Sequence, residues 1–246
     1  TLGVGAGAGF LTSELQRGRL QARLFSWLAG GVAYGVEAGT NLTLRFPGAG
    51  PLDLRLGYVQ IPAHSRRLAR TGWRVSAQAK WSRWMERAVD LGLPAIYREK
   101  DRAGLLLLDR GGKIMMDNSN SGRTYSSFSE IPPLVAASLL YIENRELLNP
   151  RNPHRNPALE WQRLAYALGM TGLKKFRPGK RTPGGSTLAT QMEKFRHSPG
   201  GRTRDAQDKL RQMVAASLRA YLGGAETMEA RRQLLRDYLN SVPLGA

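Results

Sequence analysis

The sequence predicts a mainly α-helical protein whose helical part follows a smaller region of mixed α and β structure. Apolar residues recur at helical spacing from about residue 129 nearly to the end of the chain. Residues 32–61 instead contain glycine and proline breaks between short alternating stretches, a pattern typical of strands. With 246 residues, 41% of them hydrophobic, the chain is long and apolar enough to fold around a core.

The charge of the chain points to an anionic partner. Lysine and arginine total 37 against 19 acidic residues, which gives a formal net charge of +18. A field of this sign attracts nucleic acid, anionic lipid headgroups or a diphosphate, and charge alone does not choose among them. A merely solvated basic surface is also compatible with it. The chain has no cysteine, which excludes disulfides and cysteine-ligated metal sites.

The beginning of the chain has two interpretations. Residues 1–12 open with small and apolar side chains and are either the end of a membrane anchor or a flexible leader, because so short a run cannot span a bilayer. Residues 13–28 carry leucines near helical spacing with arginines between them, which predicts an amphipathic basic helix. Such a helix either lies on a membrane or packs on its own domain.

The region that follows combines strands with a basic helical stretch. The alternating residues at 41–46 and 52–61 predict two short strands. Residues 66–91 return to a helical pattern in which tryptophans are interleaved with arginines and lysines. Aromatic and cationic side chains together suit a lipid headgroup zone or stacking on single-stranded nucleic acid. Core tryptophans beside a solvated cationic face are the third interpretation.

A hairpin and an apolar helix come next. Residues 104–117 form two apolar runs around a double glycine, and glycine permits the positive φ angles of a tight turn. Residues 134–147 then predict an apolar helix that ends in an acidic and basic cluster beginning with Glu143. Burial raises the pKa of a carboxylate and a neighbouring cation lowers it, so a carboxylate held between the two effects can act as a general base. A surface ion pair with Arg145 is the alternative.

Residues 183–203 have the features of an anion site. Glycines permit close approach of the backbone, and Ser186 or Thr187 can cap a helix that places Gln191 and Lys194 near its positive end. The stretch lacks the Gly-Lys-Ser/Thr core of a P-loop and the glycine pattern of a Rossmann fold. The surrounding density of arginine and lysine suits a doubly charged phosphate chain.

Four segments, taken in order, resemble the motifs of one enzyme family. They are ENREL (143–147), GGSTLATQMEK (184–194), DKLRQ (208–212) and LLRDYLNSVPLG (234–245). Their order and spacing resemble the motifs of the peptidoglycan glycosyltransferases found in bifunctional penicillin-binding proteins and monofunctional transglycosylases. The resemblance covers residues 104–246. It implies a lysozyme-like domain there, incomplete at its C-terminal end, after a membrane-proximal α+β region at residues 13–103.

The resemblance also implies roles for individual residues. Glu143 falls on the glutamate that serves as the family's general base. The positions that hold the donor's diphosphate in relatives match Gly184, Ser186, Thr187, Gln191 and Lys194. Further candidate contacts to the substrate are Asn144, Arg145, Arg202, Lys209 and Gln212. Asn144 replaces an aspartate of the first motif, and Gln212 replaces the glutamate of the third.

The third motif bears on cofactors. Relatives use a divalent cation such as Mg²⁺ near the diphosphate, with help from the third-motif glutamate. Gln212 is neutral and binds metal poorly, so Lys194, Lys209 and Arg202 are expected to neutralise the leaving group instead. The resemblance therefore implies a divergent transferase with weakened metal dependence, whose activity the missing glutamate could impair.

The implied function is polymerisation of a lipid-linked disaccharide precursor into glycan strands at the periplasmic face of the bacterial inner membrane. The implied partners are the precursor, the glycan strand, the membrane surface and other cell-wall enzymes. The main alternative is a non-catalytic lysozyme-like domain that binds glycan or precursor as a cell-wall scaffold. A glycan-cleaving enzyme with a single glutamate is another. No nucleic-acid partner is expected, because it would leave the four ordered motifs unexplained.

Overall fold

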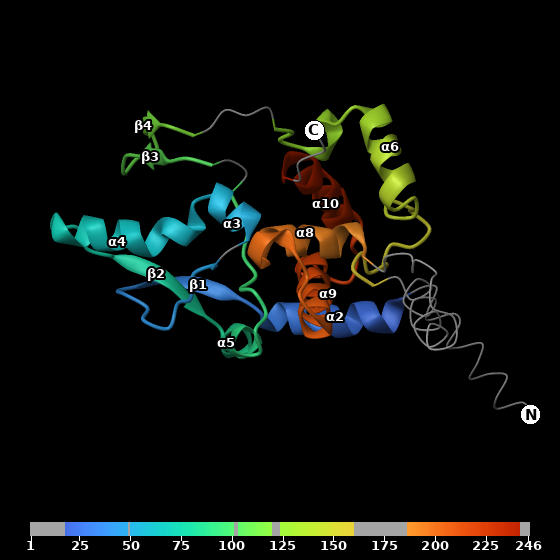
Figure 1. Cartoon of the computed structure of the whole chain (residues 1–246), viewed down its shortest axis with the longest axis horizontal. Helices are drawn as coiled ribbons and strands as arrows, with labels where there is room; N and C mark the ends of the chain where they lie inside the picture. The colour runs from blue at the N-terminus through green and yellow to red at the C-terminus, as the bar shows by residue number, and fades with distance from the viewer. Residues whose placement is uncertain (1–17, 49, 101–102, 120–123, 160–185, 242–246) are drawn as a thin grey trace, which may run out of the picture.

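The computed structural model describes residues 18–48, 50–100, 103–119, 124–159 and 186–241, and these are mainly helical (Figure 1). The α-helices among them are α2 (Arg19–Gly31), α3 (Pro51–Arg55), α4 (Ile61–Arg70), α5 (Arg83–Asp90), α6 (Pro133–Glu143), α8 (Leu188–His197), α9 (Ala206–Ala220) and α10 (Met228–Ser241). The strands are β1 (Tyr34–Ala38), β2 (Ala77–Trp81), β3 (Leu106–Leu108) and β4 (Ile114–Asp117). Short 3-10 turns lie at Tyr58–Gln60, Phe128–Glu130 and Pro199–Gly201. The predicted mainly helical class, with a smaller α+β region first, is confirmed.

Helices α8, α9 and α10 form the centre of the described structure, and α2 crosses α9 (Figure 1). Ala22 and Ala29 of α2 are buried against Leu218 and Tyr221 at the end of α9, and Met85 of α5 completes this core. Small side chains on α2 allow the two helices to approach closely. The interpretation in which this helix packs on its own protein is therefore confirmed for one of its faces.

The opposite face of α2 is apolar and exposed. Leu20, Leu24 and Trp27 are 48%, 54% and 65% exposed, and Trp27 lies edge-on against Trp84 of α5. The helix predicted at residues 13–28 is confirmed from Arg19 onward and extends to Gly31, while residues 13–17 lie outside the described residues. The proposed anchor or leader at residues 1–12 lies outside the described residues. No helix in the described part of the chain is both long and apolar enough to cross a membrane.

A second core joins α3 to α8 and α10. Leu52 and Leu56 pack with Leu188 and Met192 of α8 and with Leu235 of α10, and all five side chains are buried. The two regions predicted on either side of residue 103 therefore share both of these cores. The position of a domain boundary between them stays a prediction.

The strand predicted at residues 52–61 is wrong. These residues form α3, the turn after it and the beginning of α4. Pro51 occupies the first turn of α3, where the missing N–H of proline leaves no helical hydrogen bond unmade. Leu52 and Leu56, four residues apart, are buried, whereas Leu54 between them is 57% exposed. The apolar spacing that matters is therefore the helical one, although the same residues also alternate with a period of two.

The strand predicted at residues 41–46 is also wrong, because the strand of this region lies earlier in the chain. Strand β1 pairs with β2 in an antiparallel ribbon in which Tyr34 lies opposite Trp81. Asn41 follows the ribbon and donates from Nδ2 to the carbonyl of Ala79 at 2.8 Å. The stretch at 41–46 is consequently an irregular connection along the ribbon.

The continuous helical stretch predicted at residues 66–91 is interrupted by β2. Helix α4 ends before Gly72, whose φ of 87° lies in the left-handed region that glycine tolerates. Helix α5 begins after Ser82, whose side chain accepts a hydrogen bond from the backbone N–H of Met85. Trp73 lies between the two helices and is 69% exposed, so the core interpretation fails for this tryptophan.

The predicted hairpin at residues 104–117 is confirmed as the antiparallel pair β3–β4. Oδ1 of Asp109 accepts hydrogen bonds from the backbone N–H groups of Gly111 and Lys113, both at 2.8 Å. Gly112 has a φ of 82°, which the turn requires and which glycine adopts at little cost. The side chains of both strands are exposed.

A buried arginine of α10 holds the loop that follows α6. Arg231 is 0% exposed and donates from Nη1 to the carbonyl of Leu147 at 2.7 Å and from Nη2 to the carbonyl of Asn152 at 2.9 Å. Burial, and then the charge of Arg155, lower the pKa of Arg231 to about 10, so it remains a cation at neutral pH. The chain just after Glu143 is therefore fixed to α10.

We expect Arg231→Leu to lower the free energy of unfolding by about 3 kcal/mol, because the carbonyl groups that it binds lose their donors. Arg232→Leu is the matched control, since its side chain is 48% exposed and a surface change of this kind costs about 0.5 kcal/mol or less. Urea unfolding of both variants measures the difference. Equal losses in the two variants would contradict the assigned role of Arg231.

Candidate active site

The end of α6 meets the middle of α8 through one side-chain hydrogen bond. The chain leaves the helix at Asn144, whose φ and ψ are −163° and 89°, so Glu143 is the last residue of α6. Its carboxylate is half-buried, and Oε2 accepts a hydrogen bond from Nε2 of Gln191 at 2.9 Å. The two motifs that carry Glu143 and Gln191, 48 residues apart, are thus side by side.

Tyr238 of α10 lies behind this contact. Its hydroxyl donates to Oε1 of Gln191 at 3.4 Å, while the amide nitrogen of Gln191 points to Glu143. Burial, and then the charge of Glu143, raise the pKa of Tyr238, so its hydroxyl keeps its proton. Three motifs therefore meet in a chain of two hydrogen bonds. Tyr238 belongs to the fourth of the motifs in the sequence, and nothing in that motif indicates its position beside Gln191.

The beginning of α8 has the cap that the sequence predicts. Thr187 is the N-cap residue, and its side chain accepts from the backbone N–H of Thr190 while the Thr190 hydroxyl accepts from the backbone N–H of Thr187. This reciprocal arrangement satisfies backbone groups that the first turn of a helix leaves without partners. The positive end of the α8 dipole is therefore fixed next to Ser186.

A lysine from α9 reaches this helix end. Nζ of Lys209 donates to Oγ of Ser186 at 2.7 Å and lies 3.5 Å from Oγ1 of Thr190. Burial, and then the charge of Lys194, lower the pKa of Lys209. Lys209 thus meets the N-terminus of α8, an arrangement that favours a bound anion, while Lys194 stands in the last turn of the same helix and acts on Lys209 through its charge.

Three other predicted site residues have no described side-chain contact with Glu143, Gln191 or Lys209. Asn144 is buried, and its Oδ1 accepts from the backbone N–H of Glu146 at 3.2 Å. Arg145 is exposed, with its guanidinium 3.9 Å from the ring centroid of Tyr141. Arg202 is exposed after the 3-10 turn at Pro199–Gly201. Gly184 lies outside the described residues.

Gln212 has a structural environment. Its Nε2 donates to Oγ of Ser198 and its Oε1 accepts from Oγ1 of Thr203, both at 3.0 Å, and the side chain is buried. Both polar ends of the amide are therefore used to hold the loop between α8 and α9. A glutamate at this position would place a negative charge here.

The residues of the site do not fit a divalent cation. Within the described ranges, no three histidine or acidic side chains are grouped so that they could hold a metal ion. The charged group that contacts Ser186 is Lys209, which repels a cation, and the amide of Gln212 is engaged elsewhere. The described residues of the site therefore do not fit the Mg²⁺ that the resemblance implies.

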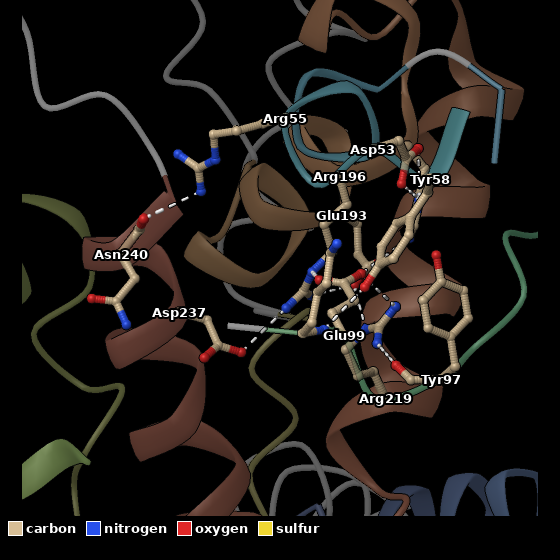
Figure 2. Close-up of polar contacts among 12 residues, drawn as sticks. Asp53, Arg55, Tyr58, Tyr97, Glu99, Glu193, Arg196, Arg219, Asp237 and Asn240 are labelled. Carbon is tan, nitrogen blue, oxygen red and sulfur yellow. Dashed lines mark hydrogen bonds and ion pairs between the residues drawn. The ribbon is translucent and has the colours of Figure 1, made fainter. Parts of the chain in front are cut away.

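The opposite face of α8 carries a buried ion network (Figure 2). Oε1 of Glu193 accepts from Arg196 at 2.8 Å and from Arg219 of α9 at 2.7 Å. Arg196 also donates to Glu99 at 2.9 Å and lies 3.3 Å from Asp237 of α10. The sequence motifs give no sign of this network, although acidic Glu193 with a basic residue three positions later is a recognisable helical pair.

The charges of this network keep Glu193 ionised. Burial by itself raises the pKa of Glu193, but the charges of Arg219, Arg196 and His197 outweigh burial and lower it to about 2. For Arg196, burial is likewise outweighed by the charges of Glu99, Glu193 and Asp237, and its pKa is raised. The network thus ties α8 to α9, to α10 and to the N-terminal region in one charged arrangement.

We expect Glu193→Gln to lower the free energy of unfolding by about 3 kcal/mol at neutral pH, because Arg196 and Arg219 lose the buried carboxylate that they share. In the unfolded chain the pKa of this carboxyl is about 4.3, above its folded value. The stability that ionised Glu193 contributes is therefore complete at pH values above the unfolded pKa, and it is lost as the pH falls toward the folded pKa of about 2.

Urea unfolding at a series of pH values measures this effect. The difference between wild type and Glu193→Gln should shrink steadily as the pH falls through the acidic range. Glu229→Gln, at a side chain that is 81% exposed, is the control and should differ little from wild type at any pH. A difference between wild type and Glu193→Gln that does not change with pH would contradict the depressed pKa.

Comparison with known proteins identifies the class. The family model described as transglycosylase matches residues 111–246, which is more than half of the chain. The chain therefore belongs to the transglycosylase family. No curated protein and no solved structure matches it. Membership implies glycosyltransferase activity in the polymerisation of peptidoglycan glycan, with a lipid-linked precursor as substrate.

Proposed function

We propose that this chain is a peptidoglycan glycosyltransferase in which Glu143 is the general base. The observation that carries the proposal is the 2.9 Å hydrogen bond between Gln191 and Glu143, because it joins the carboxylate to the helix that carries the anion site. A glycosyl transfer needs a base for the acceptor hydroxyl and a site for the leaving group. Here the base ends α6 and the site for the leaving group lies at the start of α8, the helix that α6 contacts.

In the proposed reaction, the Glu143 carboxylate removes the proton from an acceptor sugar hydroxyl. The oxygen of that hydroxyl forms a bond to the anomeric carbon of the donor, and the bond from that carbon to the lipid diphosphate breaks. The hydrogen bond from Gln191 holds the carboxylate in one orientation, and Tyr238 holds the Gln191 amide. A fixed base of this kind costs no reorganisation when the reaction occurs.

The negative charge that develops on the leaving diphosphate is stabilised at the start of α8. Lys194 and Lys209 supply positive charge, and Ser186 and Thr187 form the end of the helix at which the diphosphate binds. Gly184, a further predicted contact of the diphosphate, lies outside the described residues. Burial and the charge of Lys194 disfavour the charged form of Lys209. The negative charge of a bound diphosphate offsets the repulsion between these two lysines.

The remaining predicted contacts have different parts in this proposal. Exposed Arg145 and Arg202 bind more distant groups of the precursor or of the glycan strand. Asn144 and Gln212 keep their loops in place, since their side chains bond to neighbouring backbone or hydroxyl groups. The site works at the periplasmic face of the inner membrane, in a lysozyme-like domain at residues 104–246, beside other cell-wall enzymes.

A non-catalytic scaffold that binds the precursor is the second candidate. It is favoured by Gln212, whose amide is fully engaged with Ser198 and Thr203 and supplies no carboxylate. The two candidates differ in turnover and not in binding. An assay that measures both with the same preparation of the protein separates them.

Glu143→Gln should lower the rate of glycan polymerisation about 100-fold or more, because a general base contributes about 10² to 10⁴ to the rate. Binding of the lipid-linked precursor should be nearly unchanged, since the amide is of similar size. Glu146→Gln is the control, because Glu146 is exposed three residues further along the same motif. The measurement is the length distribution of glycan made from radiolabelled precursor.

An unchanged rate in Glu143→Gln would remove this residue from its proposed role. Binding of the precursor by wild type without any polymerisation would instead favour the scaffold.

Lys209→Gln should weaken binding of the precursor by about 10-fold to 100-fold, because a hydrogen bond from a charged donor contributes about 1.5 to 3 kcal/mol. The control is Lys113→Gln in the exposed turn between β3 and β4, which removes the same charge elsewhere. Titration calorimetry with the precursor in detergent measures both variants. Equal effects of the two changes would show that only the net charge of the protein matters.

A further inference from the structure

Helix α4 is exposed on every side. Residues 63–70 and the segment after them, through residue 77, are all exposed. The helix packs mainly on the turn at Tyr58–Gln60 and projects from the rest of the molecule at the left of Figure 1. Its sequence is therefore not explained by packing within the described part of the protein.

The exposed surface of α4 and the turn after it is strongly basic. Its charged side chains are Arg66, Arg67, Arg70 and Arg74, and no acidic residue occurs between positions 61 and 76. Among the described residues, none of the four arginines forms an ion pair with a carboxylate. Four unpaired positive charges within nine residues attract a partner that carries many negative charges.

The same helix and the turn after it also carry large apolar side chains, with Leu68 on the side of α4 away from Arg66 and Arg70. Leu68 is 50% exposed and Trp73 is 69% exposed. The backbone N–H of Trp73 donates to the carbonyl of Leu68 at 3.2 Å and that of Gly72 to Ala69 at 3.2 Å, the two hydrogen bonds of a Schellman ending. This ending brings the residue after the glycine back toward the last turn of the helix. Val75 is a third apolar side chain, 44% exposed.

We propose that this exposed amphipathic surface, with the basic residues Arg66, Arg67, Arg70 and Arg74 and the apolar residues Leu68 and Trp73, binds an anionic phospholipid membrane. The arginines pair with lipid phosphates, and Trp73 and Leu68 enter the boundary between headgroups and acyl chains. The surface lies outside residues 111–246, which match the family model, so family membership does not account for it. The inference rests on the proposed site of action at a membrane.

The chemistry of this surface favours a lipid over a nucleic acid. Binding of single strands uses several aromatic rings on which successive bases stack. Here a single tryptophan is accompanied by Leu68 and Val75, whose aliphatic side chains do not stack on bases but are well accommodated among acyl chains. A membrane offers phosphates to the arginines and an apolar layer beneath the phosphates to the tryptophan and the aliphatic side chains.

Sedimentation of the full chain with vesicles tests the charge contribution. Binding to phosphatidylglycerol-containing vesicles should be strong and should weaken with salt, whereas binding to pure phosphatidylcholine should be weak. Each arginine near an anionic surface contributes about fivefold, so replacing Arg66, Arg67, Arg70 and Arg74 with Gln should lower partitioning by about 600-fold. The matched control replaces four exposed cations elsewhere with Gln, namely Arg110, Lys113, Arg151 and Arg232, and should lose much less.

Quenching by brominated lipid tests the apolar contribution. In the wild type, part of the tryptophan fluorescence should be quenched when vesicles contain bromine on their acyl chains. Trp73→Phe should lose most of this quenching, while Trp27→Phe, which changes a tryptophan of similar exposure on α2, should retain it. Circular dichroism of each variant confirms that it is folded.

The proposal is overturned if the four-arginine variant binds anionic vesicles as tightly as its control, or if the quenching is lost in Trp27→Phe and kept in Trp73→Phe. It is also overturned if the four-arginine change abolishes binding of a single-stranded oligonucleotide but not of vesicles. These assays contain neither donor nor acceptor sugar, so their failure is distinguishable from failure of the proposed glycosyl transfer.

Discussion

The buried ion network on helix α8 is the constraint on which the candidate site depends. Glu193 and Arg196 occupy one face of the helix, and their partners come from the N-terminal region, from α9 and from α10. Buried charges of this kind are costly unless each has its partner, so the network permits few other placements of α8. The helix that carries the proposed anion site is therefore held from three sides.

The opposite side of α8 carries the residues of the proposed active site. Gln191 lies between Glu143 of α6 and Tyr238 of α10, and the capped beginning of α8 meets Lys209 of α9. A base and a cationic helix end, drawn from distant parts of the chain, thus share one scaffold. Arg231 adds to this arrangement by fixing the loop after Glu143 to α10.

Much of the helical half could be predicted from sequence, because its apolar spacing and its cap at Thr187 are local signals. The strand at residues 52–61 was mispredicted because its leucines fit both periods, and only packing against α8 and α10 decides between them. The positions of Tyr238 and Glu193 depend on how helices cross, which no local pattern encodes. The motifs assign separate roles to Glu143 and Gln191, and the hydrogen bond between the two side chains becomes visible only in the fold.

The contact between Gln191 and Glu143 is tested most sharply by the side-chain amide signal of Gln191 in proton–nitrogen NMR spectra of the wild type and of two variants. In Glu143→Gln this signal should move, because the Nε2 group loses the carboxylate that accepts its hydrogen bond, whereas Glu146→Gln should leave the signal in place. A Gln191 amide signal that is the same in the wild type and in Glu143→Gln would show that the two side chains do not meet, and the proposed site would be lost with that contact.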